Sequence, residues 1–312
     1  MRTAVCLHWI RRKSKMDFQK ELDYRATEVD LILVRELPKA EGYQANLYDA
    51  MRYSVLVGGK RLRPILMEET FKLFGGQSEA IEPFMAAIEM IHSYSLVHDD
   101  LPAMDNDKLR RGNLTTHAKY GEALGILAGD ALLNFGFEVA FRAFDRAPED
   151  SDRIIKALKI LADKAGSNGM VGGQVVDIEE SDQNGISLNR LNFLYTKKTA
   201  ALIEASMMIG AVLAGADDKH VKTIEEVARK IGLAFQIRDD VLDAIGDEET
   251  LGKEVGQDVR NQKVTYLSFV GLERAKQEVN KLSDEGITTL LALPYENRFL
   301  TKLLEFLVHR EK

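Results

Sequence analysis

The sequence contains few of the residues that cross-link chains, break helices or span membranes. Its 312 residues include one cysteine, six prolines and one tryptophan. A single cysteine excludes an intrachain disulfide framework and is typical of a protein from a reducing, intracellular compartment. The longest clean apolar run, 207–216, is about half of the roughly 20 residues that a membrane-spanning helix needs. We therefore expect no membrane span and a cytoplasmic location.

The charge balance is acidic and the composition is that of a globular protein. There are 42 basic and 49 acidic side chains, which give a formal net charge of −7, and 45% of the residues are apolar. This apolar content excludes a disordered chain. Because nucleic acid is negatively charged, the acidic sum argues against a chain-wide nucleic-acid interface.

The first fifteen residues differ from the rest of the chain. Residues 1–15 carry five basic side chains and no acidic one, and they hold both Cys6 and Trp9. The apolar stretch is short and lacks the small-residue cleavage pattern of a signal peptide. We expect residues 1–15 to be a non-native or disordered leader and residues 16–312 to form one domain.

Apolar residues recur along the chain with the period of an α-helix. The clearest stripe runs from Ile81 through Ile88 and His92 to Asp99, and another runs from Ile224 to Asp239. Similar segments lie near 17–36, 45–57, 65–74, 121–145, 152–165, 188–213, 262–283 and 296–310. Glycine or proline separates most of them, including the pairs at 58–59, 75–76 and 172–173. The pattern predicts an all-α fold, a single large helical-bundle domain of ten or more helices.

A first acidic set, Asp99, Asp100 and Asp105, ends the clearest helical stripe. The C-terminus of a helix already carries partial negative charge, so three carboxylates there need compensating cations. Pro102 prevents the helix from continuing. A bulge at this point would bring Asp105 beneath Asp99. Taken alone, the motif is equally well explained as a solvated helix end.

A second acidic set, Asp239, Asp240 and Asp243, lies on the other stripe. Asp239 and Asp243 are four residues apart, so they are neighbours on one helix face. Carboxylates without the His or Cys spacing of a zinc site suit a hard, oxygen-seeking cation. Mg²⁺ that bridges phosphate oxygens is the common case.

Basic residues form four clusters that complement the two acidic sets. The clusters are Lys60-Arg61-Leu62-Arg63 after two glycines, Arg110-Arg111-Gly112, Lys197-Lys198-Thr199, and Lys253 with Lys263. Cations at the start of a helix oppose its dipole unless an anion binds there. The spacing of a Walker loop is missing. Each cluster alone fits a solvated surface, but four of them beside two acidic sets indicate a pocket for phosphorylated ligands.

The motifs DDLPAMD and DDVLD, together with GGKRLRP, RRG, KT, FQxxDD and GK, closely resemble those of the trans-isoprenyl diphosphate synthases. Within that family the chain is similar to the bacterial farnesyl diphosphate synthase type, from about residue 16 to the end. The resemblance implies an all-helical domain around a deep central cavity and a homodimer. It also implies prenyl diphosphate substrates and several Mg²⁺ ions on the allylic diphosphate.

The same resemblance assigns roles to individual residues. Asp99, Asp105 and Asp239 would be the main Mg²⁺ ligands, supported by Asp100, Asp240 and Asp243. Isopentenyl diphosphate would be bound by Lys60, Arg63, His92 and Arg111. The allylic diphosphate would be held by Arg110, Lys198, Thr199, Gln236 and Lys253, with Lys263 nearby. A lone His on an apolar stripe, such as His92, is more often a core residue than a ligand.

Product length is expected to depend on Tyr94, which lies five residues before Asp99. At 1.5 Å per residue this places the ring about 7.5 Å along the helix from that carboxylate. The family associates an aromatic residue here with a fifteen-carbon product, while the neighbouring Ser95 is too small to block the pocket. Tyr94 as a mere core aromatic is the simpler alternative.

Other functions stay open at this point. A geranylgeranyl diphosphate synthase would differ only in pocket depth. A class I terpene cyclase also ionises a prenyl diphosphate, but it normally pairs one Asp-rich motif with an Asn/Ser/Glu-type metal site. A non-catalytic subunit of a prenyl synthase tends to lose acidic ligands, whereas all six are present here.

Overall fold

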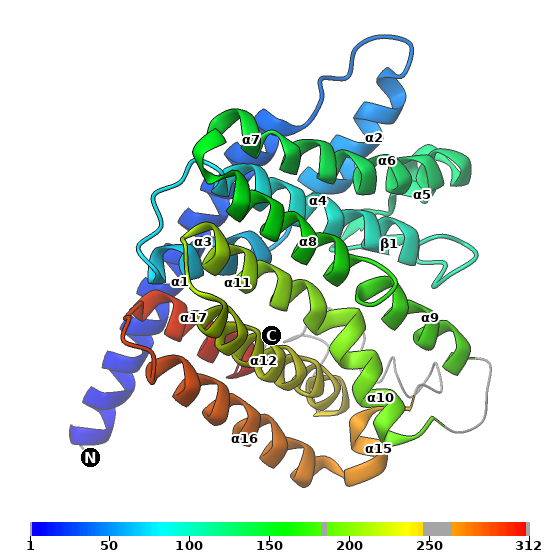
Figure 1. Cartoon of the computed structure of the whole chain (residues 1–312). Coiled ribbons are helices and arrows are strands. Elements are labelled where there is room, and N and C mark those ends of the chain that lie inside the picture. The colour runs from blue at the N-terminus through cyan, green and yellow to red at the C-terminus, as the bar shows by residue number, and fades with distance from the viewer. Residues whose placement is uncertain (1, 182–185, 246–263, 310–312) are drawn as a thin grey trace. The chain divides into compact units, whose positions relative to one another are not determined.

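The structure is a computed structural model that describes the backbone of residues 2–181, 186–245 and 264–309. Side chains are described for residues 17–179, 186–245 and 264–309. Lys253 and Lys263 therefore lie outside the described residues. The helices are α1 (Arg2–Glu36), α2 (Ala45–Leu56), α3 (Leu62–Leu73), α4 (Ile81–Asp99), α5 (Thr116–Tyr120), α6 (Glu122–Phe141), α7 (Ala143–Arg146), α8 (Ser151–Ala165), α9 (Met170–Ser181), α10 (Leu188–Leu194), α11 (Ala201–Leu213), α12 (Asp218–Ile245), α15 (Tyr266–Val270), α16 (Leu272–Leu291) and α17 (Arg298–His309). A 3₁₀ turn η1 (Pro148–Asp150), a π-helix η2 (Tyr195–Ala200) and two strands, β1 (Leu109–Arg110) and β2 (Asn113–Leu114), complete the fold (Figure 1).

The predicted all-α class is confirmed, and the two long stripes form α4 and α12. One expected boundary is wrong, because Gly172 and Gly173 lie inside α9 and do not separate helices. Gly173 is required there by packing, since a Cβ on it would lie 2.2 Å from the backbone nitrogen of Lys198. The antiparallel hairpin of β1 and β2 was not predicted, because two-residue strands are too short to show an alternating pattern.

The contacts within the chain group it into two compact units. Unit 1 comprises Met1–Ile65 and Met85–Val139, and unit 2 comprises Leu66–Phe84 and Ala140–Lys312. The boundaries fall inside α3, α4 and α6. The helix α1 begins at Arg2, so the backbone of residues 2–15 continues the same helix. The separate status of residues 1–15 and the single-domain organisation stay predictions.

Unit 1 is built on the close packing of α4 and α6. Ile88 and Ile91 of α4 and Leu132 of α6 are fully buried. Glycines on α6 let the two helices approach closely, since a Cβ on Gly136 would lie 2.9 Å from Cγ1 of Ile91. This packing holds the last turns of α4, which carry the first acidic set.

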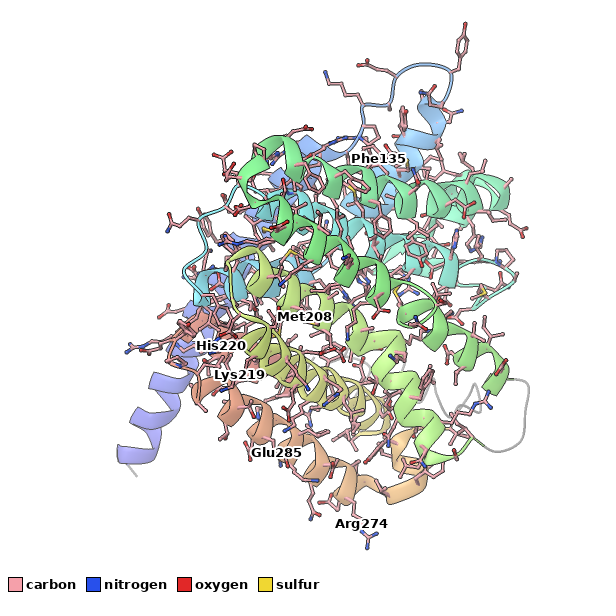
Figure 2. The ribbon with its side chains drawn as sticks, viewed as in Figure 1. Phe135, Met208, Lys219, His220, Arg274 and Glu285 are labelled. Carbon is pink, nitrogen blue, oxygen red and sulfur yellow. The ribbon has the colours of Figure 1, made fainter. Side chains whose placement is uncertain are left out.

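Unit 2 is a layer of helices in which α8, α11, α12 and α16 lie side by side in that order (Figure 1). All residues of α11 are buried, including Met208, as expected for a helix that is apolar on every side (Figure 2). The helix α12 is amphipathic and carries the second acidic set. On its outer part Lys230 pairs with Glu285 of α16 at 3.2 Å.

Candidate active site

The first acidic set is folded back on itself at the end of α4. The backbone N–H of Asp105 donates to the carbonyl oxygen of Asp99 at 2.9 Å, and that of Asn106 donates to Leu101 at 3.1 Å. Asn106 adopts a positive φ of 54°, which turns the chain out of the loop. The predicted bulge is therefore present, and it returns Asp105 to the backbone of Asp99.

Asp100 points away from this bulge toward the hairpin. Its buried carboxylate accepts from Nε of Arg110 at 2.8 and 3.0 Å, and Nη2 of Arg110 lies 2.6 Å from Oδ1. Burial raises the pKa of Asp100, and the charge of Arg110 opposes that rise. Such a bidentate pair has fixed geometry. Arg110 and Asp100 thus anchor the hairpin to the acidic loop.

The hairpin turn presents Arg111. Arg111 and Gly112 have φ values of 53° and 75°, as in the two-residue type I′ turns that join short strands. The guanidinium of Arg111 donates to the carbonyl oxygen of Gly58. Gly59 has a φ of 155°, which other residues rarely adopt, and a Cβ on it would lie 2.6 Å from Nη1 of Arg111, so glycine favours this approach. The hairpin therefore brings Arg111 to the glycine loop before α3.

The cations of that loop divide into two kinds. Arg61 is 2% exposed and pairs with Glu89 at 2.9 Å and Asp30 at 2.7 Å. It also donates to the carbonyl oxygen of Val55 at 2.8 Å. Arg61 is thus fully satisfied inside unit 1, whereas Lys60 is exposed. The role of Arg61 is to hold the loop, because residues of the protein itself already occupy its guanidinium.

Arg63 and His92 lie near other positively charged side chains, among them Arg111. The buried Nε of Arg63 has no hydrogen-bond partner among the described residues. Burial and the nearby Arg111 lower the pKa of Arg63 to about 10, although Glu89 opposes the shift. Burial, followed by the charges of Arg63 and Arg111, lowers the pKa of His92 well below its usual 6.5. The arrangement in unit 1 suits an anion, which would supply the missing acceptor and charge.

Tyr94 and Ser95 lie on α4 between His92 and the acidic loop. The ring of Tyr94 is 6% exposed. Burial, with a smaller contribution from the charge of Asp99, raises the pKa of its hydroxyl. Ser95 donates to the carbonyl oxygen of His92 at 2.9 Å, so its hydroxyl is turned back onto its own helix.

The second acidic set lies on α12 in unit 2, and its members differ in surroundings. Asp239 is half-buried, and Asp240 and Asp243 are buried. Oδ2 of Asp240 accepts from the Tyr195 hydroxyl at 2.6 Å and from the Tyr266 N–H at 2.8 Å. Asp240 therefore ties α12 to η2 and to the start of α15. Asp239 and Asp243 share the helix face expected from their spacing.

The KT motif lies in the π-helix η2, which packs against α9 and α12. Nζ of Lys198 lies 2.5 Å from a carboxylate oxygen of Asp177, and the Thr199 hydroxyl donates to Oε1 of Gln236 at 2.8 Å. π-Helical turns are frequent at functional sites. The structure thus brings Thr199 and Gln236 together, one turn before Asp239.

Sequence reasoning missed Asp177. Its signal was available, because Asp177 follows Gly173 by four residues and so lies on the same face of α9. Gly173 admits the backbone of η2, and the carboxylate on that face then meets Lys198.

Within the described residues, no three His, Cys, Asp or Glu side chains already form a metal-binding group. The first acidic set belongs to unit 1 and the second to unit 2.

Comparison with known proteins identifies the family. The polyprenyl synthetase signature matches residues 44–289. The chain belongs to the polyprenyl synthetase family. It is 43% identical over 282 residues to the geranylgeranyl diphosphate synthase of Cyanophora paradoxa, covering 90% of this chain and 93% of that protein. It is 39% identical over 294 residues to the farnesyl diphosphate synthase of Micrococcus luteus, covering 94% and 99%.

A solved structure agrees in fold and sequence. The geranyltransferase of Helicobacter pylori, complexed with magnesium and isoprenyl diphosphate, superposes with a TM-score of 0.78 at 34% identity and covers 93% of this chain and 95% of its own. This polyprenyl synthetase is therefore a trans-prenyltransferase, a trans-prenyl diphosphate synthase with the all-α fold. Its relatives include both farnesyl and geranylgeranyl diphosphate synthases.

One stretch in the described part of the chain, Glu122–Arg146, is long and apolar enough to cross a membrane by length and composition alone. It comprises α6 and α7, and its window is 39% buried. Core helices of globular proteins pass the same test. Asp130, Asn134 and Glu138 are exposed along α6.

Proposed function

We propose that this prenyltransferase condenses isopentenyl diphosphate with dimethylallyl diphosphate and then with geranyl diphosphate, giving farnesyl diphosphate. The observation that carries the fifteen-carbon product is the buried ring of Tyr94, 6% exposed on α4. It lies about 7.5 Å along the helix from Asp99 at 1.5 Å per residue. Its hydroxyl, whose ordinary pKa of 10 is raised further by burial, is uncharged, so the side chain offers a neutral, bulky floor to the growing chain.

The isopentenyl diphosphate site is proposed to consist of Lys60, Arg63, His92 and Arg111. Its support is the buried Nε of Arg63, which no described residue satisfies, and the positive charge of Arg111 beside it. A diphosphate there would accept charge-assisted hydrogen bonds from the guanidinium groups. His92, kept neutral by its lowered pKa, can donate one N–H without adding further charge.

The allylic diphosphate is proposed to bind through Mg²⁺ held by Asp99, Asp105 and Asp239. The donor set fits, because carboxylate oxygens are the ligands that Mg²⁺ prefers and the bulge returns Asp105 to Asp99. Bound Mg²⁺ supplies charge neutralisation for the departing diphosphate. Asp100, Asp240 and Asp243 are proposed as supporting residues, and the first two are themselves oriented by hydrogen bonds from Arg110 and Tyr195.

Side chains of the chain itself complete the proposed allylic site. They are Lys198, Thr199 and Gln236 on η2 and α12, Arg110 in the hairpin, and Lys253 and Lys263 outside the described residues. The contact between Lys198 and Asp177 supports this role, because it restrains a flexible ammonium group beside Thr199. A restrained cation loses less conformational entropy when a diphosphate binds.

The protein is proposed to act in the cytoplasm as a homodimer. Ile126 and Leu127 on α6 are 41% and 53% exposed, although most of the other apolar residues of this helix are at least partly buried. An exposed apolar patch of this kind favours association. Light scattering should give the mass of two chains. Leu127→Glu should lower that mass to one chain, whereas Asn134→Asp on the same helix should not.

The proposed reaction is tested with labelled isopentenyl diphosphate, dimethylallyl diphosphate and Mg²⁺, with and without EDTA. Dephosphorylated products are separated by chain length. Farnesol that depends on the metal supports the proposal. Geranylgeraniol would establish the second candidate, which the 43% identity to a geranylgeranyl diphosphate synthase favours. Hydrocarbon formed from geranyl or farnesyl diphosphate supplied alone, without incorporation of isopentenyl diphosphate, would indicate a cyclase, and no turnover of any of these substrates by folded protein would indicate a non-catalytic subunit.

Tyr94→Ala tests the floor, with Ser95→Ala as its matched neighbour. We expect Tyr94→Ala to raise the ratio of twenty-carbon to fifteen-carbon product about tenfold, the scale on which apolar pockets discriminate between chain lengths. Ser95→Ala should leave the ratio unchanged, because its hydroxyl is bonded to its own helix. An unchanged ratio in Tyr94→Ala would remove Tyr94 from the proposal.

A further inference from the structure

The imidazole of His98 packs directly against the ring of Tyr94. The two residues are four apart on α4, so they share a helix face. Their ring centroids are 5.7 Å apart and their planes meet at 89°. This edge-to-face geometry is favoured by the ring quadrupoles and restricts the orientation of both rings.

His98 is in turn fixed to α6. Its Nε2 lies 3.1 Å from the carbonyl oxygen of Ile126 and 3.7 Å from Oδ1 of Asp130. A carbonyl oxygen can only accept, so Nε2 carries the hydrogen and donates it. The imidazole is therefore held at one end by the backbone of α6 and contacts Tyr94 from α4.

Gly129 provides the space for this imidazole. A Cβ on Gly129 would lie 2.1 Å from Nε2 and 2.2 Å from Cδ2 of His98, which is far inside any non-bonded contact. Gly129 is inside α6 and has no positive φ, so the backbone conformation does not require glycine. The ring of His98 occupies the place that any other side chain at residue 129 would fill.

The ring of Tyr94 is held by packing and not by a hydrogen bond among the described residues. In the part of the chain that the structure describes, no hydrogen bond to its hydroxyl is formed. The ring is nevertheless 6% exposed, so packing alone determines its position. His98 is the aromatic neighbour in that packing, and its own position is set by Gly129 and Ile126.

We infer that His98 is a positioning residue for Tyr94, and that Gly129 and His98 together set the depth at which chain growth stops. The inference rests on the proposed function, since it takes Tyr94 as the floor for the prenyl chain. His98 acts on product length through Tyr94 and not by touching the substrate. Loss of the imidazole, or its displacement by a larger residue 129, frees the Tyr94 ring to move and deepens the pocket.

The test measures the ratio of twenty-carbon to fifteen-carbon product together with the total rate of condensation. The variants are His98→Ala, Gly129→Ala and the double variant that carries both substitutions. In the double variant the Cβ of residue 129 no longer overlaps the imidazole, because that ring has been removed. All three should raise the ratio about tenfold, the discrimination that apolar pocket contacts provide. The double variant keeps the test decisive if Gly129→Ala alone fails to fold.

A double-mutant cycle separates an indirect role from an independent one. In the Tyr94→Ala background, His98→Ala should not raise the ratio further, because the group it positions is gone. Gly286→Ala on α16 is the control for a helical glycine. The atoms nearest to its Cβ would belong to the side chains of Ile231 and Lys230, the closest at 3.2 Å, and this variant should keep the wild-type ratio.

The outcomes distinguish this inference from the proposed function. If wild-type protein makes farnesyl diphosphate and Tyr94→Ala lengthens the product, but folded His98→Ala and Gly129→Ala keep the wild-type ratio, the inference alone is overturned. A slower reaction with an unchanged ratio also overturns it, because that is the signature of a merely structural residue. A wild type that makes the twenty-carbon product overturns the floor itself, and the role of His98 with it.

Discussion

The N–H of Asp105 donates to the carbonyl oxygen of Asp99 at 2.9 Å, the bond that residue 103 would make in a continuing α-helix. Two additional residues are thus looped out around Pro102, and Asp105 takes the place four positions after Asp99. The separation of six residues becomes the equivalent of the four-residue separation between Asp239 and Asp243. The backbone of Asp105 thus returns to Asp99 after one turn, as that of Asp243 follows Asp239 after one turn of α12.

Asp105→Asn should reduce kcat at least about 100-fold with Mg²⁺, since several kcal/mol of metal-based charge stabilisation would be lost. Asp107→Asn in the same loop is the control. Its carboxylate lies 3.8 Å from Arg110, and its loss should change kcat by less than about threefold, as expected for an exposed pair. Steady-state kinetics at saturating Mg²⁺ decide, and equal losses in both variants would contradict a ligand role for Asp105.

Tyr195→Phe should destabilise the fold through Asp240. The substitution removes the 2.6 Å hydrogen bond to a buried carboxylate, which costs about 1–3 kcal/mol. Asp239→Asn, one residue away, should leave the unfolding free energy nearly unchanged and reduce kcat. Urea unfolding followed by circular dichroism measures the first effect, and turnover measures the second. If Tyr195→Phe lowered kcat without lowering the unfolding free energy, and Asp239→Asn did the reverse, the roles given to Asp239 and Asp240 would be contradicted.

Arg61 and Arg63 should respond in opposite ways. Arg61→Met leaves Glu89 buried without its partner and should cost about 3–5 kcal/mol of stability. Arg63→Gln removes a desolvated charge whose Nε has no hydrogen-bond partner among the described residues, so stability should be unchanged or higher while KM for isopentenyl diphosphate rises at least about tenfold. Thermal melts and initial rates separate the two. A loss of stability in Arg63→Gln without a change in KM would refute its assignment.

The lowered pKa of His92 makes stability depend on pH. Below 6.5 the unfolded chain binds a proton at His92 that the folded protein does not bind until its much lower pKa is reached. The unfolded state therefore gains protons first, and stability falls as pH decreases below 6.5. His92→Gln should weaken this decline, whereas His309→Gln at the exposed end of α17 should not. The Tm measured between pH 7 and pH 5 provides the comparison, and parallel curves for wild type and His92→Gln would count against the shift.

Much of the fold was predictable because it depends on local periodicity. The stripes ending at Asp99 and Asp239 predicted α4 and α12, and Pro102 predicted the interruption where the bulge occurs. Gly172 and Gly173 misled the prediction, because glycine marks a helix boundary in sequence but here admits a neighbouring backbone. The hairpin escaped detection because two-residue strands leave no pattern.

The sequence by itself determined the class of fold and the motifs that indicated the family, because helix periodicity and each motif depend on residues close together in the chain. Only the tertiary structure decided how the surroundings differ between residues of the same type within one motif. Arg61 is paired inside unit 1, while Nε of Arg63 has no hydrogen-bond partner in the described part of the chain, and Asp240 is bonded to Tyr195. It also placed His98 in the space beside Gly129. These assignments depend on contacts between residues far apart in sequence, which side-chain type and spacing do not specify.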